Sequence, residues 1–270
     1  MTITHASLFS GIGGFDLAAE WAGWTNAFNC EIDPFCRKIL KYHFPDAEQY
    51  GDIRTTDFAV WRDRIDVLTG GFPCQDASIA KQHGEGQQGL KGTRTGLYTE
   101  MLRAVREVRP RYVIAENVAN ILAVNGGWDF AVILDSLERL GYDVEWRITR
   151  ASEIGAPHHR ARCYLVAYPC SIGLHEGQSF FSDVRAQAEP IRRMFAGATI
   201  KVGLTWDAEL SVCLDDYGLP HGLAGYEMSR SEIVKHTFQA PGNAVVPQVA
   251  LQIFETINKY ENYERSGNKH

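Results

Sequence analysis

Short apolar runs rich in β-branched residues alternate with segments of helical period over the first two thirds of the chain. The clearest helical pattern covers residues 129–140 and ends at Gly141. A second predicted helix has Asp33 as its N-cap and ends before Pro45. The apolar runs predict strands at residues 6–9, 27–31, 66–70, 112–116, 144–149 and 163–168.

This alternation predicts an α/β fold with a mostly parallel sheet covered on both faces. After residue 168 the rhythm stops, Gly, Ser and Pro recur, and a helical pattern returns only over 243–260. We therefore predict a large domain and a smaller lobe, followed by a helix that returns to the large domain and a frayed polar tail. The predicted boundaries are 1–168, 169–240, 241–262 and 263–270.

The composition is that of a soluble globular protein, with 270 residues, 45 % hydrophobic and 22 % charged. No run approaches the roughly 18 apolar residues of a membrane span, and the N-terminus lacks the features of a secretion signal. These features predict a cytoplasmic protein. The six cysteines form no C-x-x-C pair, which argues against a zinc site or a disulfide framework, and most are expected to be buried.

The net charge of −6 does not indicate a nucleic-acid-binding protein by itself. Acidic residues are frequent in the first third, whereas basic residues gather later, for example at 147–162 and 185–201. Because the local field matters more than the sum, a basic cleft on an acidic body is compatible with this pattern. An ordinary acidic protein is equally compatible with charge alone.

A glycine-rich turn follows the first predicted strand and reads Phe9-Ser10-Gly11-Ile12-Gly13-Gly14-Phe15. Glycines allow a tight turn and a close approach of the backbone to a ligand. Asp16 occupies the third glycine position of G-x-G-x-x-G, which counts against an NAD-linked dehydrogenase. The turn suits a nucleoside cofactor without a pyrophosphate, and a purely structural turn is the alternative.

Acidic residues stand where the next two strands are expected to end. Glu31 closes the second strand, where a carboxylate can bind both hydroxyls of a ribose. Asp52 lies about where a third strand should end and could accept a hydrogen bond from an adenine amino group. A surface charge and a helix cap are the respective alternatives. Together with the glycine turn, these residues favour an adenosine-type cofactor.

The segment with the strongest catalytic signal is Gly70-Gly71-Phe72-Pro73-Cys74-Gln75, directly after the strand at 66–70. A cysteine in a glycine–proline loop at the carboxyl end of a strand is placed as a nucleophile is. A buried structural cysteine is the alternative.

Glu116 ends the strand at 112–116 and is expected to face the same cleft as Cys74. Such a carboxyl can be held protonated by burial or a nearby anion and can then donate to a ring nitrogen. Arg160 and Arg162 are two residues apart, so in an extended segment they point to the same side. Their guanidinium groups could hold a nucleobase carbonyl, a phosphate or Glu116. A helix-terminal charge and solvent-exposed arginines are the alternatives.

In combination, these segments resemble the DNA (cytosine-5)-methyltransferase family. The resemblance covers residues 4–168 and resumes at 242–247, and Phe-Pro-Cys-Gln, Glu-Asn-Val and Arg-x-Arg occur in the family's order. It implies a Rossmann-like fold that binds S-adenosyl-L-methionine, with a target-recognition lobe. It also implies that Cys74 attacks C6 of a flipped-out cytosine, Glu116 donates to N3, Arg162 holds O2 and Arg160 supports the site.

The resemblance also implies further contacts. The residues expected to bind the cofactor are Phe9, Gly11, Ile12, Gly14, Glu31, Ile32, Asp52, Ile53, Pro73, Leu97, Asn243 and Ala244. The residues expected to contact the substrate are Phe72, Gln75, Ser78, Arg94 and Val118. Residues 81–98 would form a loop that closes over the DNA. The sequence departs from the family pattern at Ser7, Ile32 and His158.

The implied partner is double-stranded DNA, with no metal and no membrane, and a cognate restriction endonuclease would act separately. Two alternatives stay open. One is an RNA (tRNA) cytosine-5 methyltransferase on the same scaffold, and the other is a non-catalytic, cofactor-binding DNA module.

Overall fold

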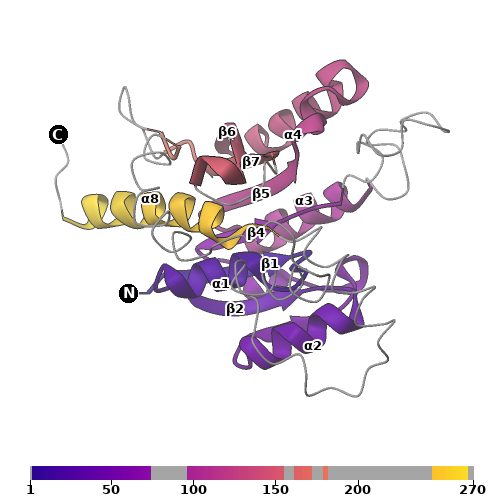
Figure 1. Ribbon diagram of the computed structural model, residues 1–270, viewed down its shortest axis with the longest axis vertical. Coiled ribbons are helices and arrows are strands. Elements are labelled where there is room, and N and C mark those ends of the chain that lie inside the picture. The colour runs from indigo at the N-terminus through magenta and orange to yellow at the C-terminus, as the bar shows by residue number, and fades with distance from the viewer. Residues whose placement is uncertain (1, 74–95, 155–160, 172–178, 182–244, 267–270) are drawn as a thin grey trace, which may run out of the picture.

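The computed structural model describes residues 2–73, 96–154, 161–171, 179–181 and 245–266 (Figure 1). Its seven strands form one sheet in the order β3-β2-β1-β4-β5-β7-β6. Neighbouring strands from β3 to β5 pair in parallel, whereas β7 pairs antiparallel with both β5 and β6. The bounds are β1 Thr4–Leu8, β2 Thr25–Cys30, β3 Glu48–Tyr50, β4 Val67–Gly70, β5 Tyr112–Val118, β6 Tyr142–Arg150 and β7 Ala161–Pro169.

Helices cover both faces of this sheet, as the alternating pattern predicts. The α-helices are α1 Gly14–Trp21, α2 Pro34–His43, α3 Gly96–Val108, α4 Trp128–Glu138 and α8 Pro247–Arg265. Short 3₁₀ turns are η1 Ile53–Thr55, η2 Ala59–Trp61, η6 Ala119–Leu122, η7 Val124–Gly127 and η8 Ala151–Ile154. The fold is the predicted doubly wound, Rossmann-like α/β fold. Its strand order reverses between β1 and β4, where such folds bind ligands beyond the carboxyl ends of the strands.

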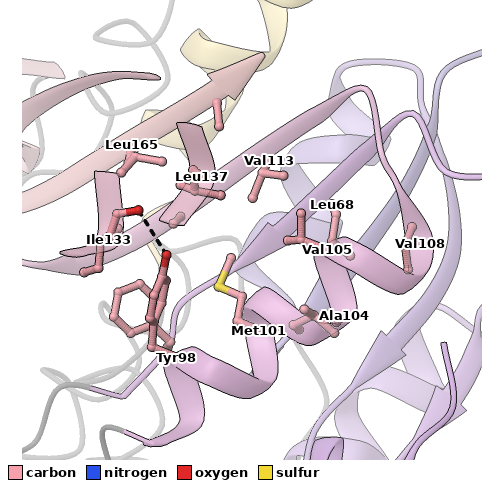
Figure 2. Packing of buried hydrophobic residues seen from close by; sticks show 14 of the residues in the cluster. Leu68, Tyr98, Met101, Ala104, Val105, Val108, Val113, Ile133, Leu137 and Leu165 are labelled. Atoms are coloured by element: carbon pink, nitrogen blue, oxygen red, sulfur yellow. Dashed lines mark hydrogen bonds between the residues drawn. The ribbon is translucent and has the colours of Figure 1, made fainter. Parts of the chain in front are cut away.

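Two hydrophobic clusters divide the core between the faces of the sheet. On one face α3 and α4 pack against β4, β5 and β7, and Figure 2 shows Met101 of α3 close to Leu68 and Val113. The Tyr98 hydroxyl donates to the carbonyl of Ile133 at 3.1 Å, which ties α3 to α4 (Figure 2). On the other face α1 and α8 pack against the opposite sides of the same strands.

The predicted strands and the helix capped by Asp33 are confirmed, with ends shifted by a few residues. Asp33 accepts from the backbone N–H groups of Phe35 and Cys36. The predicted end of the loop at 81–98 is wrong, because α3 already begins at Gly96 and Tyr98 is buried in the core. The expected fraying beyond Tyr260 is also wrong, because α8 continues to Arg265.

Residues 179–181 contribute to the core of the large domain. The Phe180 ring lies 5.9 Å from that of Tyr112 and 5.0 Å from that of Tyr168. The Glu145 carboxylate accepts from the Ser179 hydroxyl and the Phe180 N–H. These three residues fall within the predicted lobe at 169–240, which otherwise lies almost entirely outside the described residues.

Three of the cysteines are buried as expected, Cys30, Cys36 and Cys163, whereas Cys170 is exposed. Within the described residues, no helix is both long and apolar enough to span a membrane.

The C-terminal helix is fastened to the start of β5 by a buried carboxylate. Glu261, 3 % exposed, accepts from both terminal nitrogens of Arg111, at 2.8 and 2.7 Å, and from the Tyr112 hydroxyl at 2.7 Å. Removing one partner of such a pair leaves a buried charge uncompensated.

We expect Arg111→Met to destabilise the fold by about 2 kcal/mol, below the usual cost of breaking a buried pair because the guanidinium is half exposed. Urea unfolding followed by circular dichroism measures this change. The matched control is Arg139→Met, because the Arg139–Asp135 pair is exposed on both sides and its loss should cost at most about 0.5 kcal/mol. Equal losses in both variants would contradict the anchoring role of Glu261.

Candidate active site

The described candidate residues lie along one edge of the sheet. The parallel strands β1, β2, β3, β4 and β5 all end at this edge, and β7, which is antiparallel, begins there. The glycine turn follows β1, Glu31 follows β2, Asp52 follows β3, Phe72 follows β4, and Glu116 lies near the end of β5. The order predicted from the sequence is therefore realised along a single edge.

The glycine turn is held in a left-handed conformation, which is easy for Gly11 and Gly13 but unfavourable for Phe9. Phe9, Gly11 and Gly13 have φ angles of 51°, 55° and 89°. A Cβ atom added at Gly11 would meet nothing within 4 Å, so the backbone of this residue borders open space. A Cβ atom at Gly14 would lie 2.6 Å from the Val245 carbonyl oxygen, so Gly14 allows the chain entering α8 to pack on α1. The Ile12 side chain is buried in a small cluster with residues of α2.

Glu31 ties the end of β2 to the glycine turn. Its Oε2 accepts from the Gly11 N–H at 2.8 Å, and its Oε1 accepts from the Asp33 N–H at 2.8 Å. Burial raises the pKa of the Glu31 carboxyl, against the lowering effect of these backbone hydrogen bonds. Because an ionised carboxylate has about four acceptor positions, these backbone hydrogen bonds leave it acceptor capacity for a ligand hydroxyl.

Asp52 accepts hydrogen bonds from Arg54, which were not predicted from the sequence. Its carboxylate accepts from the Arg54 backbone N–H at 3.0 Å and from the guanidinium at 2.7 Å. The hydrogen bonds from Arg54 lower the pKa of Asp52. Asp52 is therefore a helix cap, the alternative left open above. Its neighbour Ile53 is buried in the core, whereas Ile32 at the end of β2 is 59 % exposed.

Glu116 and Arg162 form an ion pair between β5 and β7. The Nε of Arg162 lies 2.9 Å from Oε1 of Glu116, whose side chain is 8 % exposed. The antiparallel register places Val118 opposite Arg162, which brings the two charges together from adjacent strands. A Cβ atom on Gly71 would lie 3.4 Å from Oε2 of Glu116, so the loop after β4 runs directly beside this carboxyl group.

Asn117 fastens that loop to β5. Its amide donates to the Phe72 carbonyl at 3.2 Å, and its oxygen accepts from the Val118 N–H at 2.8 Å. Phe72 is 4 % exposed and packs on the ring of Tyr98 at 5.1 Å, so its side chain belongs to the core and offers little surface to a substrate. The role of Asn117 was not predicted from the sequence, although its place in Glu-Asn-Val could have indicated it.

Pro73 is the last described residue of the loop after β4, and Leu97 and Val118 are partly buried against the core. Several predicted site residues lie outside the described residues: Cys74, Gln75, Ser78, Arg94, Arg160, Asn243 and Ala244.

A buried polar cluster beneath the glycine turn was not predicted. The Asp16 carboxyl is fully buried and accepts from the Ser7 hydroxyl at 2.9 Å. Burial raises the pKa of Asp16 to about 7. His5 is also fully buried, between Asn26 and Thr69, and burial lowers its pKa to about 4.

Within the described ranges, no group of three or more His, Cys, Asp or Glu side chains is arranged to hold a metal ion.

A family model described as C-5 cytosine-specific DNA methylase matches residues 3–193. This chain belongs to that family. Among curated relatives, it is 34 % identical over 165 residues to the type II methyltransferase M.NgoBI of Neisseria gonorrhoeae, covering 61 % of this chain and 50 % of that protein. It is 38 % identical over 162 residues to M1.ScrFI of Lactococcus lactis subsp. cremoris, covering 60 % and 40 %. The chain thus spans half or less of the length of these methylases.

Solved methyltransferase structures share the fold of this chain. The Dnmt2 methyltransferase of S. pombe matches with a TM-score of 0.63 and 14 % identity, covering 95 % of this chain and 99 % of that one. The methyltransferase EhMeth of Entamoeba histolytica matches with a TM-score of 0.65 and 14 % identity, covering 96 % and 98 %. At this identity the likeness concerns the fold alone.

Proposed function

We propose that this chain transfers a methyl group from S-adenosyl-L-methionine to C5 of cytosine in double-stranded DNA. The observation that carries the proposal is the Glu116–Arg162 pair, buried at the sheet edge beside the loop that leads into Cys74. The same edge carries the glycine turn and Glu31. A methyl donor bound at the ends of β1 and β2 would therefore face a nucleobase bound at the ends of β4 and β5. They would meet at the switch point, where the strand order reverses between β1 and β4.

The residues present fit the cofactor. Gly11 borders open space, and Glu31 keeps acceptor capacity for a ribose hydroxyl. Phe9, Ile32 and the backbone around Asp52 and Pro73 would complete the pocket, with Leu97, Asn243 and Ala244. When bound, S-adenosyl-L-methionine supplies an electrophilic methyl group on its sulfonium.

The protein's own groups activate the cytosine. Carbon 5 of cytosine is a poor nucleophile. Attack of the Cys74 thiolate on C6 turns C5 into an enamine-like carbon that can accept a methyl group. Glu116 donates a proton to N3, so the ring accepts the electron pair. Arg162 holds Glu116 through Nε and would direct its remaining N–H groups toward O2, with Arg160 supporting the site. Once C5 carries the methyl group, its proton passes to solvent water, the electron pair of that C–H bond re-forms the C5–C6 double bond and expels the Cys74 thiolate, and the N3 proton returns to Glu116.

The target base must leave the duplex to reach this site. Gln75, Ser78, Arg94 and Val118 would contact the extruded nucleotide, and residues 169–240 would supply target recognition. A cytoplasmic location and a restriction endonuclease that acts separately fit this proposal.

The cofactor assignment predicts that Glu31→Gln lowers the affinity for S-adenosylhomocysteine by about 10- to 100-fold, because it removes charge-assisted hydrogen bonds worth about 1.5–3 kcal/mol. Isothermal titration calorimetry measures the dissociation constant. The matched control is Glu48→Gln on the neighbouring strand β3, whose exposed carboxylate accepts from the Tyr50 hydroxyl. An unchanged affinity in Glu31→Gln would contradict the pocket.

The reaction is tested by incubating the protein with tritiated S-adenosylmethionine and either duplex DNA or tRNA. The proposal expects label on cytosine in DNA, and bisulfite sequencing of host DNA after expression in a methylation-free strain would identify the site. Label on tRNA alone would favour the RNA methyltransferase. Cofactor binding without transfer to either substrate would favour the non-catalytic module.

A further inference from the structure

The buried carboxyl group of Asp16 stands directly beneath the glycine turn. It lies in the first turn of α1 with no exposed surface, and its two oxygens are 2.9 and 3.0 Å from the Ser7 hydroxyl. The Ser7 hydroxyl is in turn 2.7 Å from that of Ser10, the residue before Gly11. A continuous chain of hydrogen bonds therefore leads from α1 to the turn.

An ionised Asp16 would be poorly solvated in this position. The described residues form no ion pair with its carboxyl group, and the single Ser7 hydroxyl hydrogen cannot serve both oxygens. On its own helix, the charge of Glu20 disfavours ionisation further, although the backbone N–H of Asp16 has the opposite effect. Burial of this kind favours the neutral acid.

Among the described residues, no cation of the elements packed on α1 pairs with Asp16. In the last turn of α2 the basic residues are Lys41, which donates to the Pro45 carbonyl at 2.8 Å, and His43. From β1 comes His5, whose pKa burial lowers to about 4, and from β2 come the amides of Asn26 and Asn29, with Glu31 beyond them. The buried side chains of α8 are apolar or amides, except Glu261, which Arg111 holds at the opposite edge of the sheet.

Ser10 connects this series of hydrogen bonds to the glycine turn. Its hydroxyl accepts from the Cys30 N–H at 3.1 Å and lies 3.3 Å from the Cys30 carbonyl, to which it can donate. Its own carbonyl accepts from Gly13 at 2.9 Å. The residues that follow Cys30 and Ser10 are Glu31 and Gly11, which are joined by the 2.8 Å hydrogen bond of the proposed ribose site.

We propose that Asp16 is a positioning residue for the cofactor turn and acts as a neutral acid that donates to Ser7. This inference rests on the proposed function. With Asp16 protonated, Ser7 donates to Ser10, and Ser10 is free to donate to the Cys30 carbonyl, which ties β1 to β2. With Asp16 ionised, Ser7 must donate to it and Ser10 turns its hydrogen to Ser7, so the Cys30 carbonyl keeps only the Ser10 backbone N–H, at 3.2 Å, and the tie between β1 and β2 is weakened.

Cofactor affinity should therefore fall as Asp16 ionises. The pKa of about 7 places the change between about pH 6 and pH 8.5. Loss of one neutral hydrogen bond corresponds to about a 2- to 10-fold weaker binding of S-adenosylhomocysteine.

The test compares wild type with Asp16→Asn, whose amide donates to Ser7 at every pH and cannot ionise. In calorimetric titrations from pH 6 to 8.5, the two proteins should bind S-adenosylhomocysteine alike at pH 6, and wild type should then bind increasingly more weakly than Asp16→Asn. Titration of the ligand or of Glu31 is common to both proteins and cancels. Glu20→Gln, on the same helix, removes a charge that disfavours ionisation of Asp16, so it should keep a pH dependence but move it to lower pH.

Two further readouts separate positioning from a merely structural role. Ser7→Ala breaks the chain and should bind more weakly at pH 6 with no pH dependence. Because the folded-state pKa of Asp16 lies above its ordinary value of 3.8, wild type loses stability as the pH rises from about 4 to about 7. The melting temperature of Asp16→Asn relative to wild type should therefore rise over that interval, with or without ligand.

The outcomes are distinguishable. Binding by wild type with the same pH dependence in Asp16→Asn would overturn the inference and leave the proposed function standing. Absence of binding by wild type at every pH would overturn the proposed function, and the inference with it.

Discussion

Replacing Glu116 by glutamine should lower the single-turnover rate of methyl transfer to duplex DNA by about 10²- to 10⁴-fold, the usual contribution of a positioned acid. Glutamine has nearly the same size and can still lie against Arg162, but it cannot deliver a proton to N3. The cytosine ring then has no means of accepting the electron pair that the attack at C6 pushes into it. Rapid-quench experiments with tritiated S-adenosylmethionine and saturating enzyme measure this rate directly.

A matched control separates this chemistry from the loss of an ion pair. Glu107 is also paired with an arginine, Arg103, at 2.7 Å, but it lies near the end of α3, remote from the carboxyl edge. Glu107→Gln should keep the wild-type rate, and both variants should bind S-adenosylhomocysteine as wild type does. A wild-type rate in Glu116→Gln would remove the proposed acid, whereas equal losses in both variants would indicate a folding defect.

The positions of several candidate residues at the sheet edge could be predicted from the sequence where local position was enough. Strand ends are visible as the points where apolar runs stop, and parallel strands bring their carboxyl ends to one edge. Glu31 and Glu116 could be placed in this way, and both lie on that edge. Arg162 could be placed because β7 begins at the same edge.

The buried polar cluster could not be predicted, because its partners are distant in sequence. Ser7 and Asp16 are nine residues apart, and His5 and Thr69 are 64 apart. A serine or an aspartate in a helical pattern carries no local sign of burial, since such residues are mostly exposed. Asp16 drew attention only as a missing glycine, whereas its role in the fold comes from the neighbours that folding supplies.

The errors in helix ends have similar causes. Repeated glycines before α3 conceal its start at Gly96, since glycine is unfavourable within helices. The last turns of α8 are polar, so hydrophobic period gives no signal there. They are stabilised instead by the contacts of Glu261 with Arg111 and, at 3.7 Å, with Arg265 one turn later. Packing of this kind depends on tertiary structure.

The two halves of the switch point are built differently, and this suits their proposed tasks. Around the glycine turn, the backbone N–H groups of Gly11 and Asp33 hold the Glu31 carboxylate, and the buried Ser10 hydroxyl accepts from the neighbouring Cys30 N–H. Around Glu116, a guanidinium from a neighbouring strand and the loop after β4 lie close to the carboxyl group. Neutral hydrogen bonds can preorganise a pocket for a nucleoside, whereas an ion pair can stabilise charge that develops on a pyrimidine ring.

Replacing Cys74 by alanine should abolish methyl transfer, with a loss of at least about 10³-fold, because it removes the thiolate that is proposed to bond to C6. Binding of S-adenosylhomocysteine should be unchanged, since that site is built on β1 and β2. The matched control is Cys170→Ala, an exposed cysteine whose N–H donates to the Gly141 carbonyl after β7 has returned to the opposite edge. It should keep full activity. Loss of cofactor binding in Cys74→Ala would instead make the cysteine structural.

The covalent step itself can be trapped. In duplex DNA that carries 5-fluorocytosine at the target, attack by Cys74 and methylation at C5 proceed, but fluorine cannot leave as a proton does. The enzyme should then stay bonded to C6 and migrate with the DNA on a denaturing gel, only when S-adenosylmethionine is present. Cys74→Ala should give no such band, and Cys170→Ala should give the wild-type band. If wild type turns over unmodified DNA yet leaves no denaturant-resistant complex with the fluorinated substrate, methyl transfer does not pass through a cysteine adduct.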